Sequence, residues 1–264
     1  MARWNPEQYA RFARERRQPF DELLALVERR ARMEVIDLGC GNGPLTIELA
    51  AALDARRVTG LDSSPAMLTS ARDELARRRA EPVTATVRFE LGEIEAYAPE
   101  AAVDLVFSNA ALHWVDDHPA LFERLRGWLR RGGQLAVQMP CNESHASHRV
   151  AAEVAAEAPF AEAMRGRARR SPVLAPEAYA ELLARLGFGR QSVRLQIFGH
   201  ELESSADVVE WVRGSLLTFY EAILGAERFA EFVTRYRTRL LGVIGDRRPY
   251  FYAYRRVLLW GIVG

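Results

Sequence analysis

The sequence predicts an α/β protein built on a doubly wound, mostly parallel β-sheet. Short apolar runs rich in β-branched residues alternate with segments of helical periodicity over the first 140 residues. Strands that alternate with helices pair in parallel through right-handed crossovers. The runs VIDL (35–38) and DLVF (104–107) are typical of strands that are apolar on both faces, as helices on both sides of a sheet require.

Each predicted strand is followed by turn or cap residues. The five strands are expected at 34–38, 57–62, 85–91, 103–109 and 133–140. Four-residue spacing behind a proline predicts two of the intervening helices, carried by Leu45, Leu49 and Leu53 behind Pro44 and by Met67, Ala71 and Leu75 behind Pro65.

The pattern changes after Pro140. Residues 143–187 predict two helices that flank a basic, proline-containing loop, and residues 192–202 alternate like a strand. Residues 205–243 are largely helical in pattern, and the aromatic tail at 250–263 is strand-like.

Two parts are therefore expected. Residues 1–142 form an N-terminal helix and the sheet core, and residues 143–264 form helical insertions over the substrate plus the last two strands of the same sheet. The helical additions, at 143–190 and 204–247, are expected to cap one edge of the sheet and to form its lid.

Composition excludes several classes of protein. The formal net charge is +1, which gives no general attraction to nucleic acid or to anionic membranes. All 36 basic residues are arginine, so a high arginine count is weak evidence for anion binding. The N-terminus lacks an apolar signal core, and the two cysteines form neither a disulfide framework nor a metal site. We expect a cytoplasmic protein with no metal, no nucleic-acid partner and no membrane partner.

The stretch EVIDLGCGNGPLTIELA places three glycines between a strand and a helix. A dinucleotide-binding loop needs a third glycine where this chain has Pro44, and a phosphate-binding P-loop needs a lysine, which this chain lacks. Asp62 ends the next strand 21 residues after Gly41, where a carboxylate accepts hydrogen bonds from a ribose diol. Loop and acid together indicate a nucleoside ligand.

Three motifs, DLGCGNG, LDSSPAML and DLVFSNAALHW, resemble those of the class I S-adenosylmethionine-dependent methyltransferases. The resemblance implies a Rossmann-like sheet whose last strand is antiparallel, with S-adenosylmethionine as cofactor. It implies that Gly39 and Gly41 lie against the cofactor, that Asp62 binds the ribose and that Glu93 contacts the adenine amino group. The cofactor-binding residues it implies are Arg16, Gly39, Cys40, Gly41, Asp62, Ser63, Met67, Glu93, Ile94, Asn109 and Ala110.

Four further segments, at 4–24, 109–122, 132–142 and 211–220, resemble the methyltransferases that act on trans-aconitate. This resemblance implies esterification of a small carboxylic acid, with trans-aconitate as the first candidate. It also implies an N-terminal lid carrying Trp4, Tyr9 and Phe12, and packing of these aromatic residues as one face of a helix is an equal alternative.

A carboxylate substrate is already ionised near neutral pH and needs no general base, which agrees with the absence of an obvious base constellation. His113 and Trp114 follow the fourth strand and are the candidate catalytic residues. Asn142 and Arg255 are the candidate substrate contacts, Arg255 chosen from four arginine pairs near the termini and in the basic loop. Cys40 is interpreted as a small packing residue.

His145 and His148 are interpreted as ordinary surface histidines, because a third metal ligand is missing. The fold and motifs leave three alternatives open. These are a methyltransferase for a different small molecule or natural product, a protein that binds S-adenosylmethionine without turnover, and a nicotinamide oxidoreductase. Pro44 argues against the last.

Overall fold

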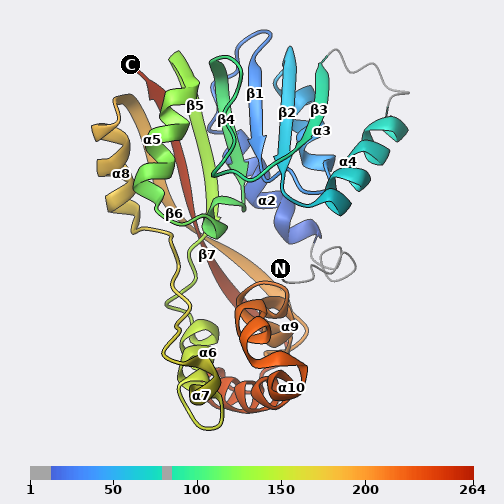
Figure 1. The fold of residues 1–264 in the computed structure, drawn as a ribbon, viewed down its shortest axis with the longest axis vertical. Helices are drawn as coiled ribbons and strands as arrows, with labels where there is room; N and C mark the ends of the chain where they lie inside the picture. The colour runs from blue at the N-terminus through green and yellow to red at the C-terminus, as the bar shows by residue number, and fades with distance from the viewer. Residues whose placement is uncertain (1–12, 79–84) are drawn as a thin grey trace. The chain divides into compact units, whose positions relative to one another are not determined.

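A computed structural model describes residues 13–78 and 85–264, with side chains from residue 17 onward. Its sheet has seven strands in the order β3-β2-β1-β4-β5-β7-β6 (Figure 1). The strands are β1 (Glu34–Leu38), β2 (Arg57–Asp62), β3 (Thr86–Leu91), β4 (Val103–Asn109), β5 (Leu129–Pro140), β6 (Phe188–Leu202) and β7 (Tyr250–Val263).

The helices alternate with the first strands and then follow one another. They are α2 (Ala13–Leu24), α3 (Pro44–Ala52), α4 (Pro65–Arg78), α5 (His118–Trp128), α6 (Ala146–Ala155), α7 (Phe160–Met164), α8 (Pro176–Arg185), α9 (Asp207–Arg213) and α10 (Leu216–Ile244), with a 3-10 turn η1 (Leu112–Trp114) after β4.

The predicted doubly wound sheet is confirmed. β1 pairs in parallel with β2 and with β4, β2 with β3, and β4 with β5, whereas β7 pairs antiparallel with β5. The strand order therefore reverses between β1 and β4. In open α/β sheets, ligands bind at the carboxyl ends of the strands where the order reverses.

Five of the strands begin and end within one residue of the predicted bounds, and three predictions need correction. β5 begins at Leu129, four residues before 133, because Leu129 pairs with Val103 of β4. The register between β4 and β5 shifts after this pair. β6 begins at Phe188 rather than 192. The segment 143–187 holds three helices instead of two, since α6 ends at Ala155 and Pro159 starts a separate short helix.

The chain forms two compact units. The sheet unit comprises residues 17–140, 172–196 and 256–264, and the helical unit comprises residues 141–171 and 197–255. The cap predicted at 143–190 is thus divided, because α8 belongs to the sheet unit.

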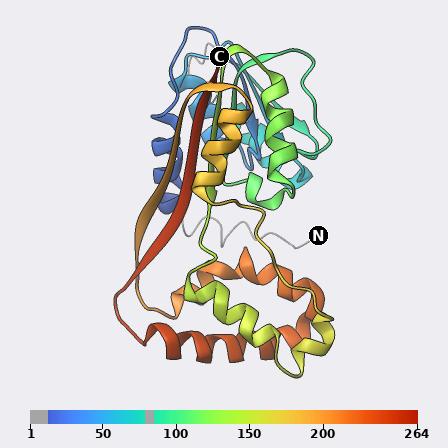
Figure 2. The same cartoon turned by 90° about the vertical axis from the view of Figure 1, so that its left-hand side faces the viewer.

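The core of the sheet unit lies on both faces of the strands. On one face Phe20 of α2 contacts Phe107 of β4 edge to face, with ring centroids 5.6 Å apart. Elsewhere in the sheet unit α5 and α8 pack together through Phe122 and Tyr179, whose rings lie 5.4 Å apart. Figure 2 shows α5 beside α8, with α2 on the other side of the strands.

The helical unit has its own aromatic core, formed by α6, α7, α9 and α10 with the first residues of β7. Phe232 of α10 stacks on Tyr220 at 4.9 Å and meets Phe160 of α7 edge to face at 5.4 Å. Gly225, with φ of 71°, interrupts α10 between two helical segments. This break lets α10 bend, so that both of its helical segments pack in the same core.

In residues 13–78 and 85–264 we find no helix with the length and apolar character needed to cross a membrane. Trp4, Tyr9 and Phe12 lie outside the described residues, as does the side chain of Arg16.

Candidate functional site

The residues predicted to bind the cofactor lie in the sheet unit where four adjacent parallel strands end. The glycine loop follows β1, Asp62 ends β2, Glu93 follows β3 and Asn109 ends β4. These strand ends form one edge, called the carboxyl edge below. It brings together the predicted residues Gly39, Cys40, Gly41, Asp62, Ser63, Met67, Glu93, Ile94, Asn109, Ala110, His113 and Trp114.

The glycine loop, residues 39–43, is held against the end of β2. The amides of Gly39 and Cys40 donate to the carbonyl oxygen of Leu61 at 2.8 and 3.0 Å. Gly39 and Gly41 have φ values of 74° and 56°, a region that glycine adopts without steric cost. A Cβ built on Gly41 would meet no atom within 4 Å, so the loop leaves room for a ligand to approach its backbone.

Asp62 joins this loop to the start of α4. Its Oδ2 accepts from the amide of Gly41 and its Oδ1 from the amide of Ser64, both at 2.9 Å. An ionised carboxylate has about four acceptor positions, so each oxygen keeps one for a ligand. The side chain is half-buried, and its orientation is fixed by two loops at once.

Cys40 packs within the loop. A Cβ on Gly60 would lie 3.0 Å from its Sγ, so the thiol occupies the space that this glycine leaves. Burial, together with the negative charges of Asp37 and Asp62, raises the pKa of the Cys40 thiol far above its ordinary value. Because the thiolate is the nucleophilic form, Cys40 is a packing residue, in agreement with the sequence interpretation.

Asp37 is a residue of this edge that the sequence analysis missed. It is 5% exposed on β1 and accepts from the Thr46 hydroxyl at 2.6 Å. Burial and the nearby charge of Asp62 raise the pKa of Asp37 to about 6, against the opposing effect of the Thr46 hydrogen bond. The signal was a charged residue within an otherwise apolar strand. Such carboxyls cluster at functional sites.

The raised pKa predicts a pH-dependent stability. Between about pH 4 and pH 6 the unfolded chain ionises Asp37 while the folded chain keeps it protonated, so this carboxyl costs stability as pH rises. We expect Asp37→Asn to gain about 3 kcal/mol relative to wild type between pH 4 and pH 7. Urea unfolding of both proteins across this range measures the difference, and parallel stability curves would contradict the assignment.

The segment after β4 presents a second group of residues. Ala110 has φ of 59°, an uncommon conformation for alanine that turns the chain sharply at the end of β4. Trp114 is 55% exposed, with its ring 4.8 Å from that of His113. The indole of Trp114 is therefore not buried under the helix that follows it.

His118 holds the segment after β4 in place through hydrogen bonds. Its Nε2 donates to the carbonyl oxygen of Leu112 at 3.0 Å, so its Nδ1 is the acceptor for the hydroxyl of Tyr179. The Tyr179 oxygen also accepts from the amide of Leu174 at 3.1 Å. Burial lowers the pKa of His118, which favours the neutral form that this chain of bonds requires.

A turn after β3 carries Glu93 and Ile94. The carbonyl oxygen of Glu93 accepts from the amides of Ala96 and Tyr97 at 3.2 and 3.0 Å. Arg124 of α5 donates to the carbonyl oxygen of Ile94 at 2.8 Å. The Glu93 side chain is exposed, so its carboxylate is accessible to a ligand.

The two predicted substrate residues, Asn142 and Arg255, lie in the helical unit. Asn142 is 1% exposed, its Nδ2 donates to the Tyr252 hydroxyl at 3.0 Å and its Oδ1 accepts from the amide of Arg255 at 3.2 Å. Its amide is thus committed to the protein, and Asn142 is not among the substrate contacts proposed below. Arg255 is half-buried and donates to the Ser144 hydroxyl at 2.6 Å, which leaves other N–H groups for a carboxylate.

The interpretation of His145 and His148 as surface histidines needs correction. Nδ1 of His145 accepts from the amide of Ser147 at 3.1 Å and caps α6. Burial, with a contribution from Arg169, lowers the pKa of His148 to about 3. In residues 13–78 and 85–264, no group of three or more His, Cys, Asp or Glu side chains is arranged to hold a metal ion.

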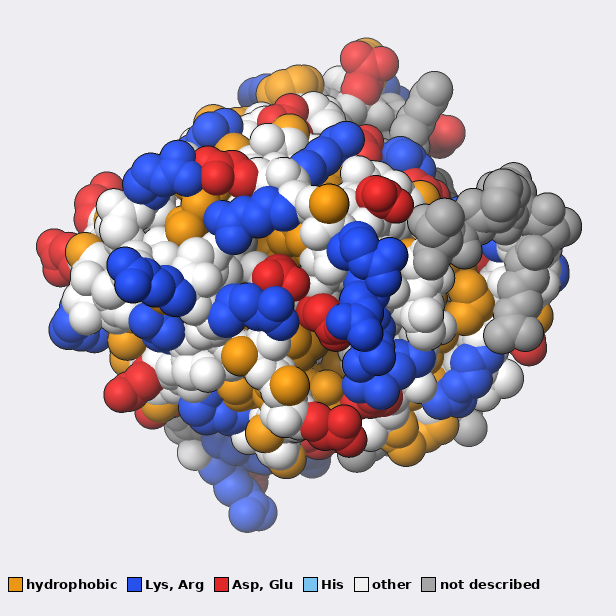
Figure 3. Space-filling model, turned by 90° about the horizontal axis from the view of Figure 1, so that it is seen from above, with side chains coloured by type: hydrophobic (Ala, Val, Ile, Leu, Met, Phe, Trp, Pro, Cys, Tyr) orange, Lys and Arg blue, Asp and Glu red, His pale blue; other side chains and the backbone are white. Residues whose placement is uncertain are grey.

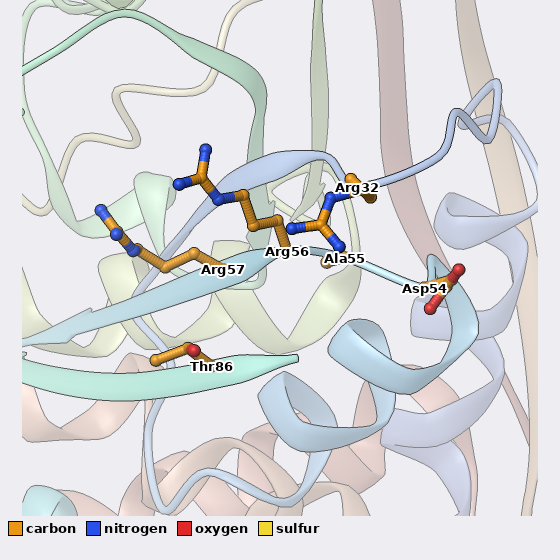
Figure 4. Close-up of a pocket in the computed structure, with 6 residues that line it drawn as sticks. All are labelled: Arg32, Asp54, Ala55, Arg56, Arg57 and Thr86. Atoms are coloured by element: carbon orange, nitrogen blue, oxygen red, sulfur yellow. The ribbon is translucent and has the colours of Figure 1, made fainter. Parts of the chain in front are cut away.

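A hollow of about 470 Å³ lies at the opposite end of the sheet, where the parallel strands begin. Figure 3 shows this end, with arginine side chains mixed with acidic ones, and Figure 4 shows Arg32, Arg56 and Arg57 at the hollow. Arg56 and Arg57 lie 3.4 and 3.7 Å from the carboxylate of Glu34 and are well exposed. The hollow is separate from the carboxyl edge.

Comparison with known proteins identifies the class. The sequence model of the methyltransferase-domain family matches residues 29–182, more than half of the chain. The chain therefore belongs to the methyltransferase-domain family, which confirms the predicted enzyme class.

Among individual relatives, a trans-aconitate 2-methyltransferase of Deinococcus radiodurans is 40% identical over 261 residues, 97% of this chain and 96% of that protein. Among solved structures, the YcgJ protein of Bacillus subtilis is 13% identical with a TM-score of 0.62, covering 94% of this chain and 98% of that one. A phosphoethanolamine N-methyltransferase of Haemonchus contortus, solved with S-adenosylhomocysteine, is 17% identical with a TM-score of 0.54, covering 94% and 52%. These structural likenesses confirm the predicted fold.

Proposed function

We propose that the chain is an S-adenosylmethionine-dependent O-methyltransferase that esterifies a carboxylate of trans-aconitate. The observation that carries the reaction class is the open space over Gly41 beside the oriented carboxylate of Asp62, in a chain of the methyltransferase-domain family. The substrate follows from the relative of nearly equal length that is named for trans-aconitate.

The cofactor is S-adenosylmethionine, and the residues of the carboxyl edge fit it. The open space over Gly41 lets the ligand approach the loop backbone, Gly39 is a further proposed contact through its backbone, and the free acceptor positions of Asp62 suit the two ribose hydroxyls. The exposed carboxylate of Glu93 suits the adenine amino group. The other proposed cofactor contacts are Arg16, Cys40, Ser63, Met67, Ile94, Asn109 and Ala110.

The bound cofactor supplies an electrophilic methyl group on a positively charged sulfur. Transfer of this methyl group to a carboxylate oxygen of the acid would give a methyl ester and leave a neutral thioether. No proton moves, so no residue has to act as a base. The protein's task is to align the three reacting atoms, which contributes up to about 7–11 kcal/mol.

His113 and Trp114 are the proposed catalytic residues because they stand at the carboxyl edge. The exposed indole of Trp114 offers an apolar surface that displaces water from the reacting carboxylate, and a carboxylate with less water around it is more reactive. Arg255, in the helical unit, stays a proposed substrate contact, since a guanidinium group binds a carboxylate in a bidentate manner.

Methyl transfer from methyl-labelled S-adenosylmethionine tests the function, with trans-aconitate, cis-aconitate, isocitrate and citrate compared in parallel. We expect trans-aconitate to be labelled fastest and the label to be released by alkali, as a methyl ester requires. Label in none of the four acids, with S-adenosylhomocysteine still bound, would reject the substrate and keep the cofactor. Failure to bind S-adenosylhomocysteine would reject both.

The absence of nucleic-acid partners and the cytoplasmic location remain predictions from the sequence. So does closure of a lid over the substrate.

A further inference from the structure

Three polar side chains form a hydrogen-bonded row across β4, β5 and β7. Nη1 of Arg256 donates to Oε1 of Gln138 at 2.9 Å, and Nε2 of Gln138 donates to Oδ1 of Asn109 at 2.6 Å. Gln138 is fully buried and Arg256 is 5% exposed, whereas Asn109 is half-buried at the carboxyl edge. The row therefore connects a buried cation to an accessible amide.

The strand register makes this contact possible. Asn109 pairs directly with Gln138 in the parallel β4–β5 ladder. Arg256 pairs with Pro140, two residues from Gln138 along β5, so the side chains of Arg256 and Gln138 share one face of the sheet. Residues that are diagonal across two strands remain within reach of a long side chain.

The arginine determines the direction of both amides. A guanidinium group carries only N–H donors, so the atom of Gln138 that faces it is the oxygen. The NH₂ group of Gln138 then faces Asn109, which must present its own oxygen. The reverse orientation of either amide would set N–H against N–H in a buried place, at a cost comparable to a lost hydrogen bond.

As a result, Asn109 turns its NH₂ group away from the sheet interior. Within residues 13–78 and 85–264, no protein group accepts a hydrogen bond from this Nδ2, and the side chain is partly exposed at the carboxyl edge. A donor that is polarised through a hydrogen-bonded row ending in a buried positive charge favours an anionic acceptor.

We propose that Arg256 and Gln138 are positioning residues that fix the Asn109 amide with its NH₂ group toward the carboxyl edge, where it donates to a carboxylate oxygen. This inference rests on the proposed function, in which both reactants carry a carboxylate: the amino-acid end of the cofactor and the acid substrate. Either of these carboxylates can accept the hydrogen bond from the Asn109 NH₂ group.

Gln138→Glu tests the row because it keeps the acceptor for Arg256 and removes the donor to Asn109. Asn109 then turns its Nδ2 inward and presents its oxygen to the ligand. We expect affinity for one of the two carboxylates to fall about ten- to hundredfold, the effect of exchanging a charge-assisted hydrogen bond for a repulsive contact. Calorimetry measures the Kd of S-adenosylhomocysteine, and then the Kd of trans-aconitate on the protein saturated with it.

The matched control is Gln134→Glu, four residues earlier on β5. Gln134 is also fully buried, accepts from the amide of Glu28 and from Trp260, and donates to the carbonyl oxygen of Glu28. Its replacement loses an equivalent buried donor far from Asn109. We expect a similar loss of stability in urea with both Kd values unchanged, because a merely structural effect would be common to the two variants.

Weaker binding of S-adenosylhomocysteine in Gln138→Glu identifies the cofactor carboxylate as the acceptor, and weaker binding of trans-aconitate identifies the substrate. Equal Kd values in Gln138→Glu and Gln134→Glu overturn the proposal. If wild type does not bind trans-aconitate, the proposed substrate fails separately, and the S-adenosylhomocysteine result alone decides the row. Asn109→Asp, at a partly exposed position, provides the same readout if Gln138→Glu does not fold.

Discussion

Asp62→Ala is expected to weaken binding of S-adenosylhomocysteine at least hundredfold and to reduce methyl transfer correspondingly at limiting cofactor. Two ribose hydroxyls that donate to an ionised carboxylate contribute about 1.5–3 kcal/mol each. The substitution also removes the acceptor of the Gly41 and Ser64 amides, so the glycine loop loses its link to the start of α4. Calorimetry with S-adenosylhomocysteine measures the loss of affinity, and urea unfolding measures the loss of stability.

Asp104→Ala is the matched control for this experiment. Asp104 lies near the start of β4, its Oδ2 accepts from the amide of Glu34 at 2.8 Å, and its Oδ1 lies 3.2 Å from Nη1 of Arg130. Its removal costs hydrogen bonds to the same kind of groups at the other end of the sheet. We expect lower stability and unchanged affinity for S-adenosylhomocysteine. Equal affinity losses in the two variants would show that Asp62 acts only through stability.

The sheet was predictable because its strands carry their own signals. β1, β2 and β4 are short, apolar and bounded by turn residues, and each begins and ends where the sequence predicts. The early part of β5 was missed because Leu129 and the residues that follow it contain no apolar alternation. Pairing with Val103 of β4 extends the strand there. Long-range pairing of this kind leaves no local pattern in the sequence.

The carboxyl edge was predictable for a related reason: parallel strands carry their ligand-binding residues at their ends. The hydrogen-bond partners and the burial of individual side chains could not be predicted in this way. Asn142 is bonded to Tyr252 and to the amide of Arg255, more than a hundred residues along the chain. The burial that lowers the pKa of His148 likewise depends on the helical unit as a whole. Only tertiary packing determines whether such a polar residue meets a ligand or the protein itself.

Gly41→Ala and Gly39→Ala are expected to separate cofactor binding from folding. A Cβ on Gly41 meets no atom within 4 Å, so the variant bears only the cost of a left-handed alanine, about 1–2 kcal/mol. Its methyl group, however, would project into the open space beside Asp62, where we propose that the cofactor binds. We expect affinity for S-adenosylhomocysteine to fall more than tenfold while the folded protein persists.

Gly39→Ala meets a different obstacle, because its Cβ would lie 2.1 Å from the Cβ of Ala111. Either the glycine loop or the segment after β4 must move, and we expect a stability loss of about 2–5 kcal/mol from the left-handed alanine together with overpacking. Gly127→Ala, in α5 with no atom near the added methyl group, is the control. It should preserve both the affinity for S-adenosylhomocysteine and the stability of the fold. If Gly41→Ala binds S-adenosylhomocysteine as wild type does, the space over the loop is not the cofactor site. The function of this edge would then have to be assigned anew.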